Sequence, residues 1–553
     1  MTAAPATPAI SSWHGWGDPA QRTGLGPPGG SARRFLHREV GLPRDIVLRV
    51  PAPLEQLRLA PPALPPGLRE RLVAVAEVRD DPLSRVEHAG GKSYLDLVRR
   101  RAGDAELAPD AVVLPADAAG VAAVLACCAK AGVAVVPFGG GTSVVGGVEP
   151  LRGRFPAVVA LDLTRLDQLL ELDEQSQTAT LQPGLRGPQA EELLNARGWT
   201  LGHLPQSFEL ATVGGWIATR SAGQASTGYG RSDDLVVALR VATPAGELVL
   251  GRAPRSAAGP DLRQLLIGSE GAFGVITEVT LAIRPLPAEQ RYEGWFFRSF
   301  AAGCAAFRAL AQEGVPADVC RLSDEDETRS QLALSGHDRG AVAAYLRLRR
   351  LRCLAVLGWE GSEQAVRRRR AASVEVLRAA GGVPVGQGVG RSSWRKGRFA
   401  APYLRDDMLD AGLLVETLET AATWRDLPAV HAAVRTALTR SLQDGEGTPL
   451  VLTHVSHLYR TGASLYVTVI DRQRAGAPGT GAQGAIEQWQ AAKRAATDAL
   501  LDAGGTLTHH HAMGTDHAPW LSREVGELGV DVLRAVKATL DPAGILNPGK
   551  LLP

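Results

Sequence analysis

Cysteine is rare in this sequence, and no two cysteines form a CxxC pair. The five among 553 residues are Cys127, Cys128, Cys304, Cys320 and Cys353. Without CxxC pairs, neither a zinc knuckle nor a thioredoxin-like redox site is expected. An odd number of cysteines with irregular spacing is typical of a reducing compartment, so we expect a cytoplasmic protein without a disulfide framework.

Long apolar runs and a strong charge imbalance are also absent. The longest apolar stretch, residues 121–136, is interrupted by Lys130 and is too short to span a bilayer. Residues 1–20 lack the basic start and apolar run of a signal peptide. The 60 Lys and Arg residues balance 58 Asp and Glu residues, and the net charge of +2 argues against nucleic acid as the main partner.

What remains is the composition of an ordinary folded protein, with 45% hydrophobic and 21% charged residues. The order of its segments predicts an α+β protein in four parts. These are an N-terminal extension with a helical segment (1–105), a Gly-rich domain (106–287), a larger α+β domain (288–503) and a C-terminal His-containing loop with a helix (504–553). Residues 1–65 are rich in Pro, Gly and Ala and are expected to include a disordered piece.

Apolar periodicity and capping residues place the main elements. Asp117 is positioned to cap a helix that runs to about Ala131. Short apolar runs rich in Val predict strands, and longer runs of good helix formers predict helices. The expected strands are 111–115, 133–137, 157–163, 178–184, 235–244 and 274–285, and the further expected helices are 67–78, 188–197 and 524–540.

A Gly cluster at residues 139–143 follows one of the predicted strands. Consecutive N–H groups of such a loop can form a concave nest for an anion, although a plain tight turn is an equal alternative for this segment alone. The pattern matches neither the ATP P-loop nor the GxGxxG of a Rossmann NAD site. Three further segments, 205–223, 268–287 and 509–514, combine Gly with small, hydroxyl or His residues. A long dinucleotide needs several separated backbone cradles, and these segments are spaced to provide them.

Together these segments resemble the FAD-binding fold of the vanillyl-alcohol oxidase / p-cresol methylhydroxylase (PCMH) superfamily, and within it the alkyldihydroxyacetonephosphate synthases most closely. The resemblance extends over nearly the whole chain, and its strength lies in the combination of motifs in the family's order. It implies a two-subdomain FAD-binding domain of the vanillyl-alcohol oxidase/PCMH type, a cap domain and a C-terminal helical/loop segment. The motifs are SWHGWGD, PFGGGTSVVGG, GHLPQSFELATVGGWIATR, YGRSDDLVVALRVATPAG, GSEGAFGVITE, RLSDEDE, LRDDMLDAG, VETLETAATW, YRTGASLYVTV and GGTLTHHHAMG.

The resemblance implies FAD as the cofactor and assigns residues to it segment by segment. The first Gly-rich loop would cradle the pyrophosphate, and the second would run beside the isoalloxazine ring and the ribityl chain. Family members with covalent flavin carry a His or Cys near the first loop, which is absent here, so we predict a non-covalent flavin. The predicted contacts are Pro137, Phe138, Gly139, Gly140, Gly141, Thr142, Ser143, Pro205, Gln206, Ser207, Phe208, Glu209, Leu210, Ala211, Thr212, Gly214, Gly215, Ala218, Thr219, Arg220, Ser221, Glu270, Gly271, Ala272, Phe273, Gly274, Val275 and Ile276.

The candidate catalytic residues are Tyr466 and the triplet His509, His510 and His511. By sequence alone Tyr466 would be an ordinary half-buried sheet tyrosine, and the triplet a solvated turn or, less readily, a metal site. In an extended segment the first and third His would share one face. The resemblance implies that Tyr466 transfers a proton and that the triplet lies near the flavin, as acid–base chemistry requires.

The candidate substrate-binding residue is Arg405, which by sequence alone would be a surface arginine paired with its acidic neighbours. In the family an arginine of this motif binds the substrate phosphate, and guanidinium suits phosphate and carboxylate equally. The Arg-rich segment 336–352 is either a solvated helix face or an interfacial contact with anionic lipid. Oligomeric state is left open, with a homodimer as one alternative.

The resemblance implies alkylglycerone-phosphate synthase activity in ether lipid biosynthesis. In this reaction the acyl group of acyl-dihydroxyacetone phosphate is exchanged for a fatty alcohol through a flavin N5 adduct, without net redox change. The alternative is a FAD-linked dehydrogenase or oxidase of a 2-hydroxy acid, such as D-lactate or glycolate, or of an alcohol. A third interpretation is an inactive flavin-binding or lipid-docking protein. One departure from the family pattern is Ala512, which stands where Gly usually follows the histidines.

Overall fold

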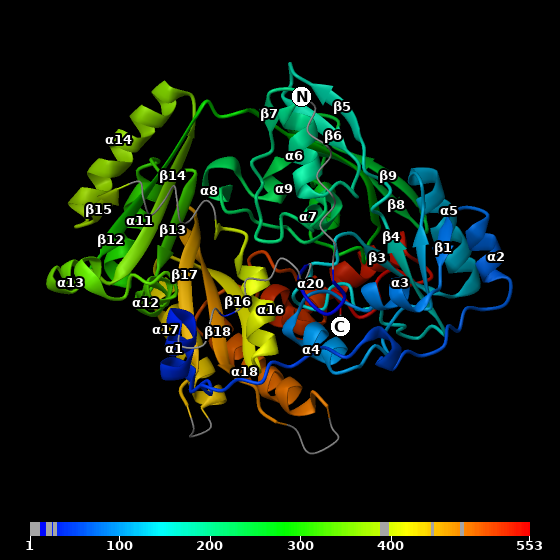
Figure 1. Cartoon of the computed structure of the whole chain (residues 1–553). Coiled ribbons are helices and arrows are strands. Elements are labelled where there is room, and N and C mark those ends of the chain that lie inside the picture. The colour runs from blue at the N-terminus through cyan, green and yellow to red at the C-terminus, as the bar shows by residue number, and fades with distance from the viewer. Residues whose placement is uncertain are drawn as a thin grey trace, which may run out of the picture.

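The computed structural model describes residues 12–17, 25, 30–386, 397–443, 447–475 and 481–552. Figure 1 shows two halves side by side, one built from smaller sheets and the other around one large sheet. Most of residues 1–29, where we predict a disordered piece, lie outside the described residues. Across the described ranges, no helix combines the length and apolarity needed to cross a bilayer. All five cysteines are free thiols.

The first sheet contains β1 (Glu77–Arg79), β2 (Ala111–Leu114), β4 (Val158–Asp162) and β3 (Ala134–Phe138), in that order. Strands β2, β4 and β3 run parallel and are almost entirely buried, as parallel strands are when other elements cover both faces. Helix α5 (Ala118–Ala131) packs on this sheet. Asp117 caps it by accepting the N–H of Gly120 at 2.8 Å, as the sequence predicts. The Gly-rich loop 139–143 leaves the sheet directly after β3.

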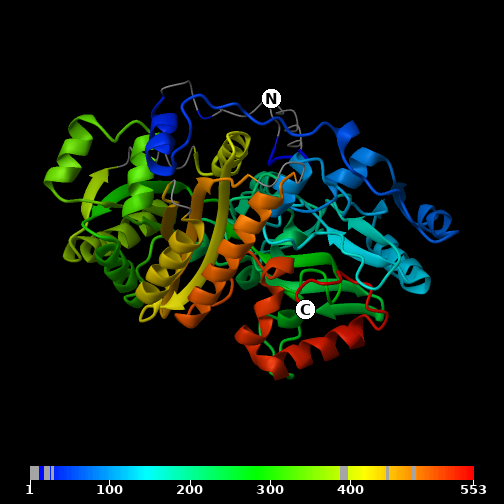
Figure 2. The ribbon, with the colours of Figure 1, turned by 90° about the horizontal axis from the view of Figure 1, so that it is seen from below.

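The second sheet is antiparallel, in the order β5 (Leu169–Asp173), β6 (Thr178–Leu181), β10 (Val275–Ala282), β8 (Val236–Thr243) and β9 (Gly246–Leu250). Alternate residues of β10 are buried, so one of its faces packs in a core. Helix α20 (Leu521–Leu540) contributes Leu521 and Val530 to this core and lies beneath the sheet in Figure 2. The C-terminal segment therefore returns to the Gly-rich half after the chain has built the other one.

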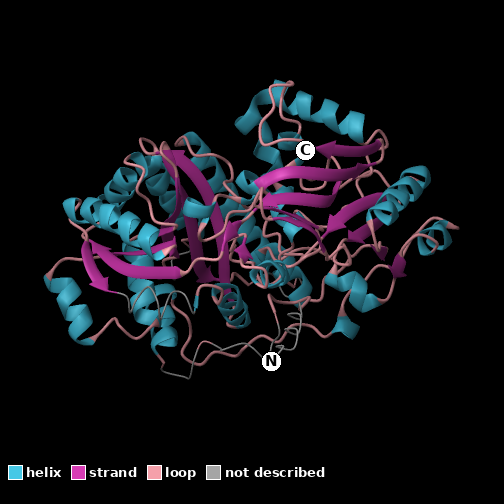
Figure 3. Ribbon diagram, turned by 90° about the horizontal axis from the view of Figure 1, so that it is seen from above, coloured by secondary structure: helices cyan, strands magenta, loops and turns pink. Residues whose placement is uncertain are grey.

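The third sheet has seven antiparallel strands, in the order β15 (Val383–Gly386), β12 (Glu289–Phe297), β14 (Cys353–Gly361), β13 (Val319–Ser323), β17 (Leu450–Leu458), β18 (Gly462–Arg472) and β16 (Leu413–Thr423). Helices cover one face of it (Figures 2 and 3): α11 (Phe300–Gln312), α14 (Glu363–Ala379), α17 (Leu427–Leu442) and α18 (Gln483–Asp502). Leu465 and Val467 of β18 face this helical core, whereas Tyr466 and Thr468 face the opposite side. Shorter helices cover parts of this opposite face, and the part that carries Tyr466 and Thr468 lines a cavity.

The remaining elements are short connections and helices around the two halves. They are α1 (Ser31–Val40), a 3-10 turn (Leu54–Gln56), α2 (Leu68–Val73), α3 (Pro82–Glu87), α4 (Tyr94–Arg101), α6 (Gly187–Asn195), β7 (Trp199–Thr200), α7 (Val213–Ala218), α8 (Ser226–Tyr229), α9 (Ser232–Leu235), α10 (Arg263–Leu266), β11 (Arg284–Pro285), α12 (Glu325–Leu334), α13 (Gly340–Leu348), α16 (Ala401–Asp410), α19 (Gly514–His517) and a 3-10 turn (Ala518–Trp520).

The helix that we predict over residues 67–78 is wrong at its C-terminal end. Helix α2 ends at Val73, and residues 77–79 form β1, which pairs antiparallel with β2. A pairing with a strand more than thirty positions away overrides the local helical pattern. The predicted helix 524–540 is found within α20, which begins at Leu521 and is kinked at Gly526, where φ is 73°.

Candidate active site

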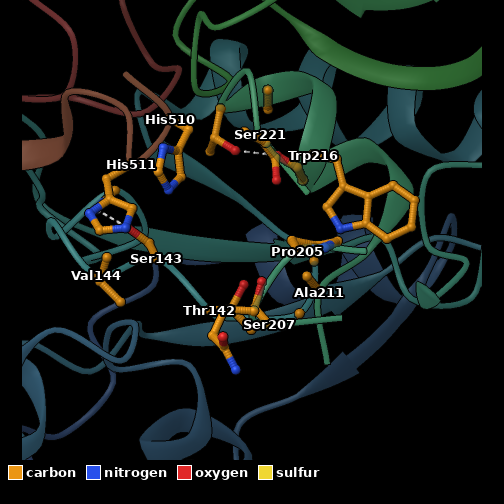
Figure 4. Close-up of a pocket in the computed structure, with 18 of the residues that line it drawn as sticks. Thr142, Ser143, Val144, Pro205, Ser207, Ala211, Trp216, Ser221, His510 and His511 are labelled. Carbon is orange, nitrogen blue, oxygen red and sulfur yellow. Dashed lines mark hydrogen bonds between the residues drawn. The ribbon is translucent and has the colours of Figure 1, made fainter. Parts of the chain in front are cut away.

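A cavity of about 420 Å³ lies between the Gly-rich half and the face of the seven-stranded sheet that carries Tyr466. This volume is typical of pockets that hold organic ligands and cofactors. Three Gly-rich segments and the loop 508–514, here called the His loop, line it. Figure 4 shows residues of the first two segments and of the His loop around this space. Strands β13, β16, β17 and β18 form the opposing wall. Segments far apart in the sequence therefore converge on one space, as the sequence predicts.

The loop 139–144 enters this cavity with its backbone N–H groups unpaired. Among the described residues, none accepts a hydrogen bond from these N–H groups. The loop also approaches another Gly-rich segment so closely that a Cβ on Gly140 would overlap the Leu210 carbonyl group. Successive N–H groups facing one space form an anion nest. This arrangement fits the pyrophosphate of a dinucleotide.

Trp216 is a further polar group that points to a ligand. It belongs to α7, is 2% exposed and lines the cavity opposite His510 and His511 (Figure 4). Its Nε1 is buried without a hydrogen-bond partner in the described part of the chain. Because a buried donor without a partner is costly, an acceptor on a bound ligand is expected beside it. Trp216 is not among the cofactor contacts that we predict from the sequence.

Most of the predicted cofactor residues line the cavity, but six do not. Phe208 stacks on Phe399 at 5.4 Å, and Glu209 accepts the Tyr403 hydroxyl at 2.6 Å. Arg220 forms an ion pair with Asp233 at 3.0 Å. The backbone or apolar side chains of the others are buried behind the walls. These six, which support the cavity from outside its lining, are Phe208, Glu209, Leu210, Arg220, Ala272 and Phe273.

The expectation that the first and third residues of the His triplet share one face is wrong. His510 and His511 both line the cavity, whereas His509 does not. His509 Nε2 lies 2.6 Å from the Tyr459 hydroxyl, and its Nδ1 lies 2.9 Å from His510 Nδ1. The reason is that the triplet is an irregular loop, so the two-residue period of a strand does not apply.

Ala512 explains part of this irregular path. Its φ is 72°, in the left-handed region that favours glycine. An L-residue pays about 1–2 kcal/mol for this conformation. The departure from the family's Gly at this position therefore falls where the backbone needs a positive φ, and the surrounding contacts must hold the loop in place.

Tyr466 lies between imidazoles on the sheet face that lines the cavity. Its ring stacks on His454 at 4.9 Å and on His510 at 6.0 Å, and meets His511 edge-on at 5.5 Å. Burial raises the pKa of Tyr466 to about 12, so the phenol keeps its proton at neutral pH. Burial lowers the pKa of His511 to about 3, so this imidazole is neutral. The site thus places the protonated phenol of Tyr466 beside the neutral imidazole of His511.

Three lining residues that we do not predict from the sequence form a polar cluster, in which Glu327 and His454 are buried and the Arg321 side chain is 26% exposed. Arg321 Nη2 lies 2.7 Å from Glu327 Oε1 and 3.1 Å from His454 Nδ1. His454 in turn contacts Glu327 at 3.0 Å. They come from β13, α12 and β17, and are brought together because β13 pairs with β17 and α12 packs on both strands. Arg321 and Glu327 stand in the quoted motif RLSDEDE, but nothing in that motif indicates that they face a cavity.

Arg405 is a buried residue of the cavity wall, not the surface arginine of the alternative interpretation. It is 8% exposed on α16. It donates to the Lys92 carbonyl at 2.9 Å and forms an ion pair with Glu416 at 3.2 Å. Its Nε has no hydrogen-bond partner among the described residues. A guanidinium held this way still has its Nε–H group available to donate to an anionic ligand.

His457, His509 and His510 place ring nitrogens within 4.8 Å of one another, which is close enough to hold a metal ion. Both ring nitrogens of His457 are already engaged, however. Nε2 contacts the Gly223 carbonyl and Nδ1 contacts the Ser464 hydroxyl, each at 3.0 Å. Ligation would require one of these hydrogen bonds to break, so we keep the prediction that no metal binds here.

Comparison with known proteins identifies the cofactor. Residues 109–251 match the family model described as FAD binding domain. Residues 286–551 match the model described as FAD linked oxidases, C-terminal domain. The cofactor is therefore FAD, and the N–H nest, the unpaired Trp216 donor and the cavity described above fit it.

Relatives and solved structures extend the likeness to the whole chain. Alkyldihydroxyacetonephosphate synthase of Trypanosoma brucei brucei is 34% identical over 579 residues, which cover 98% of this chain and 92% of the relative. A solved alkyldihydroxyacetonephosphate synthase structure matches with a TM-score of 0.83 at 29% identity, covering 98% of both chains. p-Cresol methylhydroxylase matches with a TM-score of 0.69 at 15% identity, over 89% of this chain and 98% of that one. The predicted α+β fold of the vanillyl-alcohol oxidase/PCMH type is confirmed.

Proposed function

This chain belongs to the alkyldihydroxyacetonephosphate synthase family, and we propose that it exchanges the acyl group of acyl-dihydroxyacetone phosphate for a fatty alcohol. A fatty acid leaves as the alcohol takes its place, so the overall reaction involves no net oxidation. The observation that carries the proposal is that one cavity is lined by the N–H nest of the loop 139–144, by the Arg405 guanidinium, and by the Tyr466 phenol with its neighbouring imidazoles. The nest serves FAD and the guanidinium suits a carboxylate as well as a phosphate, so the likeness to the synthases over nearly the whole chain is what favours this reaction over oxidation of a 2-hydroxy acid.

We propose that the loop 139–144 holds the pyrophosphate of FAD and that Trp216 donates to another acceptor of the cofactor. FAD is held without a covalent bond, because residues 139–143 contain no His or Cys. When bound, FAD supplies a ring system that accepts and returns electrons. The protein contributes position, electrostatics and proton transfer.

The acid–base roles rest on the position of each group in the cavity and, for Tyr466, on its protonation. Arg405 binds the substrate phosphate through its free donor, with its own orientation fixed by Glu416. His510 and His511 accept the proton that leaves the substrate carbon. Tyr466 stays protonated at neutral pH and donates to the departing carboxylate. The burial of these groups excludes water that would otherwise compete with the fatty alcohol.

An anaerobic assay with purified holoprotein distinguishes this proposal from the dehydrogenase alternative. We expect labelled fatty alcohol to enter acyl-dihydroxyacetone phosphate with release of fatty acid, and no net reduction of an added dye. Persistent bleaching of the flavin absorbance by D-lactate or glycolate, with electrons passed to the dye, would instead support the 2-hydroxy-acid dehydrogenase. Flavin that responds to none of these substrates would favour an inactive flavin-binding protein.

We further propose that α13 contacts a membrane surface from which the lipid-like substrates are taken. Val342, Tyr345 and Leu348 are exposed at 50%, 43% and 82% and, at intervals of three residues, lie on one face of this helix. Exposed arginines follow or interleave with them, at Arg347, Arg349, Arg350 and Arg352. Apolar residues beside cations are typical of an interfacial helix on anionic lipid.

A vesicle experiment tests this contact. We expect the protein to co-sediment with vesicles containing anionic phosphatidylglycerol, and a variant with Arg347, Arg349, Arg350 and Arg352 changed to Ser to sediment several-fold less, because each cation near the surface contributes about 1 kcal/mol. Exposed Arg367 and Arg368 of α14, changed to Ser together, provide the control. Equal sedimentation of the quadruple variant and the wild type would contradict the proposal.

A further inference from the structure

Glu419 of β16 is a buried carboxylate beneath the His loop that the reaction as described does not use. It pairs across the strands with Tyr466, and its side chain is 1% exposed. It does not line the cavity, so it touches neither substrate nor cofactor. A buried carboxylate is costly unless several donors satisfy it, so its partners indicate its purpose.

Those partners are consecutive donors of the His loop. Glu419 accepts the backbone N–H groups of His509 at 2.6 Å, His510 at 3.1 Å and His511 at 2.9 Å. The Thr508 hydroxyl also donates to it. The backbone of the His loop is therefore bound to the seven-stranded sheet. The imidazoles of His510 and His511 line the cavity.

A second carboxylate holds the other end of the same loop. Glu270, from the Gly-rich half, accepts the N–H of Met513 at 3.0 Å and the N–H of Gly514 at 2.9 Å. Within residues 509–514, only the N–H of Ala512 is bound by neither carboxylate. Ala512 is also the residue with the unfavourable φ. The loop adopts this path because a carboxylate from each half fixes the residues on either side.

We propose that Glu419, together with Glu270, is a positioning residue that clamps the His loop so that His510 and His511 face Tyr466. The inference deepens the proposed function, on which its kinetic consequence rests. Charge-assisted hydrogen bonds are short and directional, so three from backbone N–H groups and one from the Thr508 hydroxyl on a single carboxylate define the loop within a narrow range. Small displacements of acid–base groups are enough to lower the turnover of an enzyme substantially.

Hydrogen exchange tests the clamp without requiring any substrate. In the holoprotein, a peptide spanning residues 508–514 should exchange its amide hydrogens slowly. In Glu419→Gln the amide group supplies one acceptor oxygen and a donor that opposes the N–H groups, so exchange in this peptide should accelerate by about hundredfold. Flavin absorbance should stay at the wild-type ratio, because the N–H nest is unchanged.

The kinetic arm uses the fatty-alcohol exchange assay. We expect kcat of Glu419→Gln to fall by about 10- to 100-fold, the range for residues that orient reacting groups, with KM within about threefold of wild type. A merely structural residue would not separate kcat from KM in this way. If the variant does not retain flavin, Thr508→Val removes one donor to the same carboxylate and should give a smaller change in the same direction.

Glu191 provides a matched control. It is buried, accepts the Thr200 hydroxyl at 2.7 Å and the N–H groups of Leu201 and Gly202 at 3.1 Å each, and does not line the cavity. Glu191→Gln should leave kcat and the exchange of the His loop unchanged. Unchanged hydrogen exchange in Glu419→Gln would overturn the clamp. Accelerated exchange with unchanged kcat would overturn its positioning role, whereas an inactive wild type with the expected exchange would count only against the proposed function.

Discussion

Turnover of a Tyr466→Phe variant should fall by about 10³-fold, within the usual range for loss of a general acid or base. The ring that stacks on His454 and His510 remains, so packing is preserved and only the hydroxyl is lost. Because the phenol keeps its proton at neutral pH, the loss removes a donor that the neighbouring imidazoles do not replace. The fatty-alcohol exchange assay gives kcat, and the ratio of flavin to protein absorbance verifies that FAD is retained.

A second buried tyrosine, Tyr229, tests whether the loss of turnover is specific to the active site. The Tyr229 hydroxyl donates to Glu360 at 2.8 Å and lies outside the cavity lining. Tyr229→Phe should lower stability by about 1 kcal/mol, as loss of one hydrogen bond does, and leave kcat unchanged. Wild-type turnover in Tyr466→Phe would remove this residue from the mechanism and leave His510 and His511 as the remaining proton carriers.

The parts of the site that could be predicted are those encoded locally. The composition of the loop 139–143 predicts a close approach between backbones, because only glycine allows it. The structure has this approach between Gly140 and Leu210. Asp117 marks the start of a helix by a capping preference that acts within one turn. The motif around Tyr466 is a strand in which alternate residues are apolar, and that alternation correctly separates the residues facing the core from those facing the site.

The parts that could not be predicted depend on which strands become neighbours. Arg321 and His454 meet only because β13 pairs with β17, a register that no local pattern specifies. In the sequence, Trp216 looks like an ordinary apolar residue. Only its buried Nε1, which has no hydrogen-bond partner among the described residues, indicates an acceptor on a bound ligand. Two histidines in β17, His454 and His457, among mostly apolar residues, were the available signal for this wall of the cavity.

Replacing Gly140 by alanine should yield a protein that binds FAD at least about 100-fold more weakly, an effect equal to roughly 3 kcal/mol. The new Cβ would overlap the Leu210 carbonyl group and come too close to Ala211. Both neighbours are backbone, so no side-chain rotamer relieves the clash, and the two Gly-rich segments must move apart. Separation of these segments opens the nest that holds the pyrophosphate. Titration of apoprotein with FAD, followed by flavin fluorescence, measures the change.

Gly447→Ala is the appropriate control for this substitution. At Gly447 an added Cβ would meet no atom of the described residues closer than 3.7 Å, and this residue does not line the cavity. Its FAD affinity should equal that of the wild type, and its melting temperature should rise with added FAD, since a ligand that binds only the folded state stabilises it. Gly140→Ala should lose most of this FAD-dependent rise. Full FAD affinity in Gly140→Ala would mean that the loop 139–144 does not bind the pyrophosphate, because a cradle set by backbone contact cannot tolerate that displacement and keep its ligand.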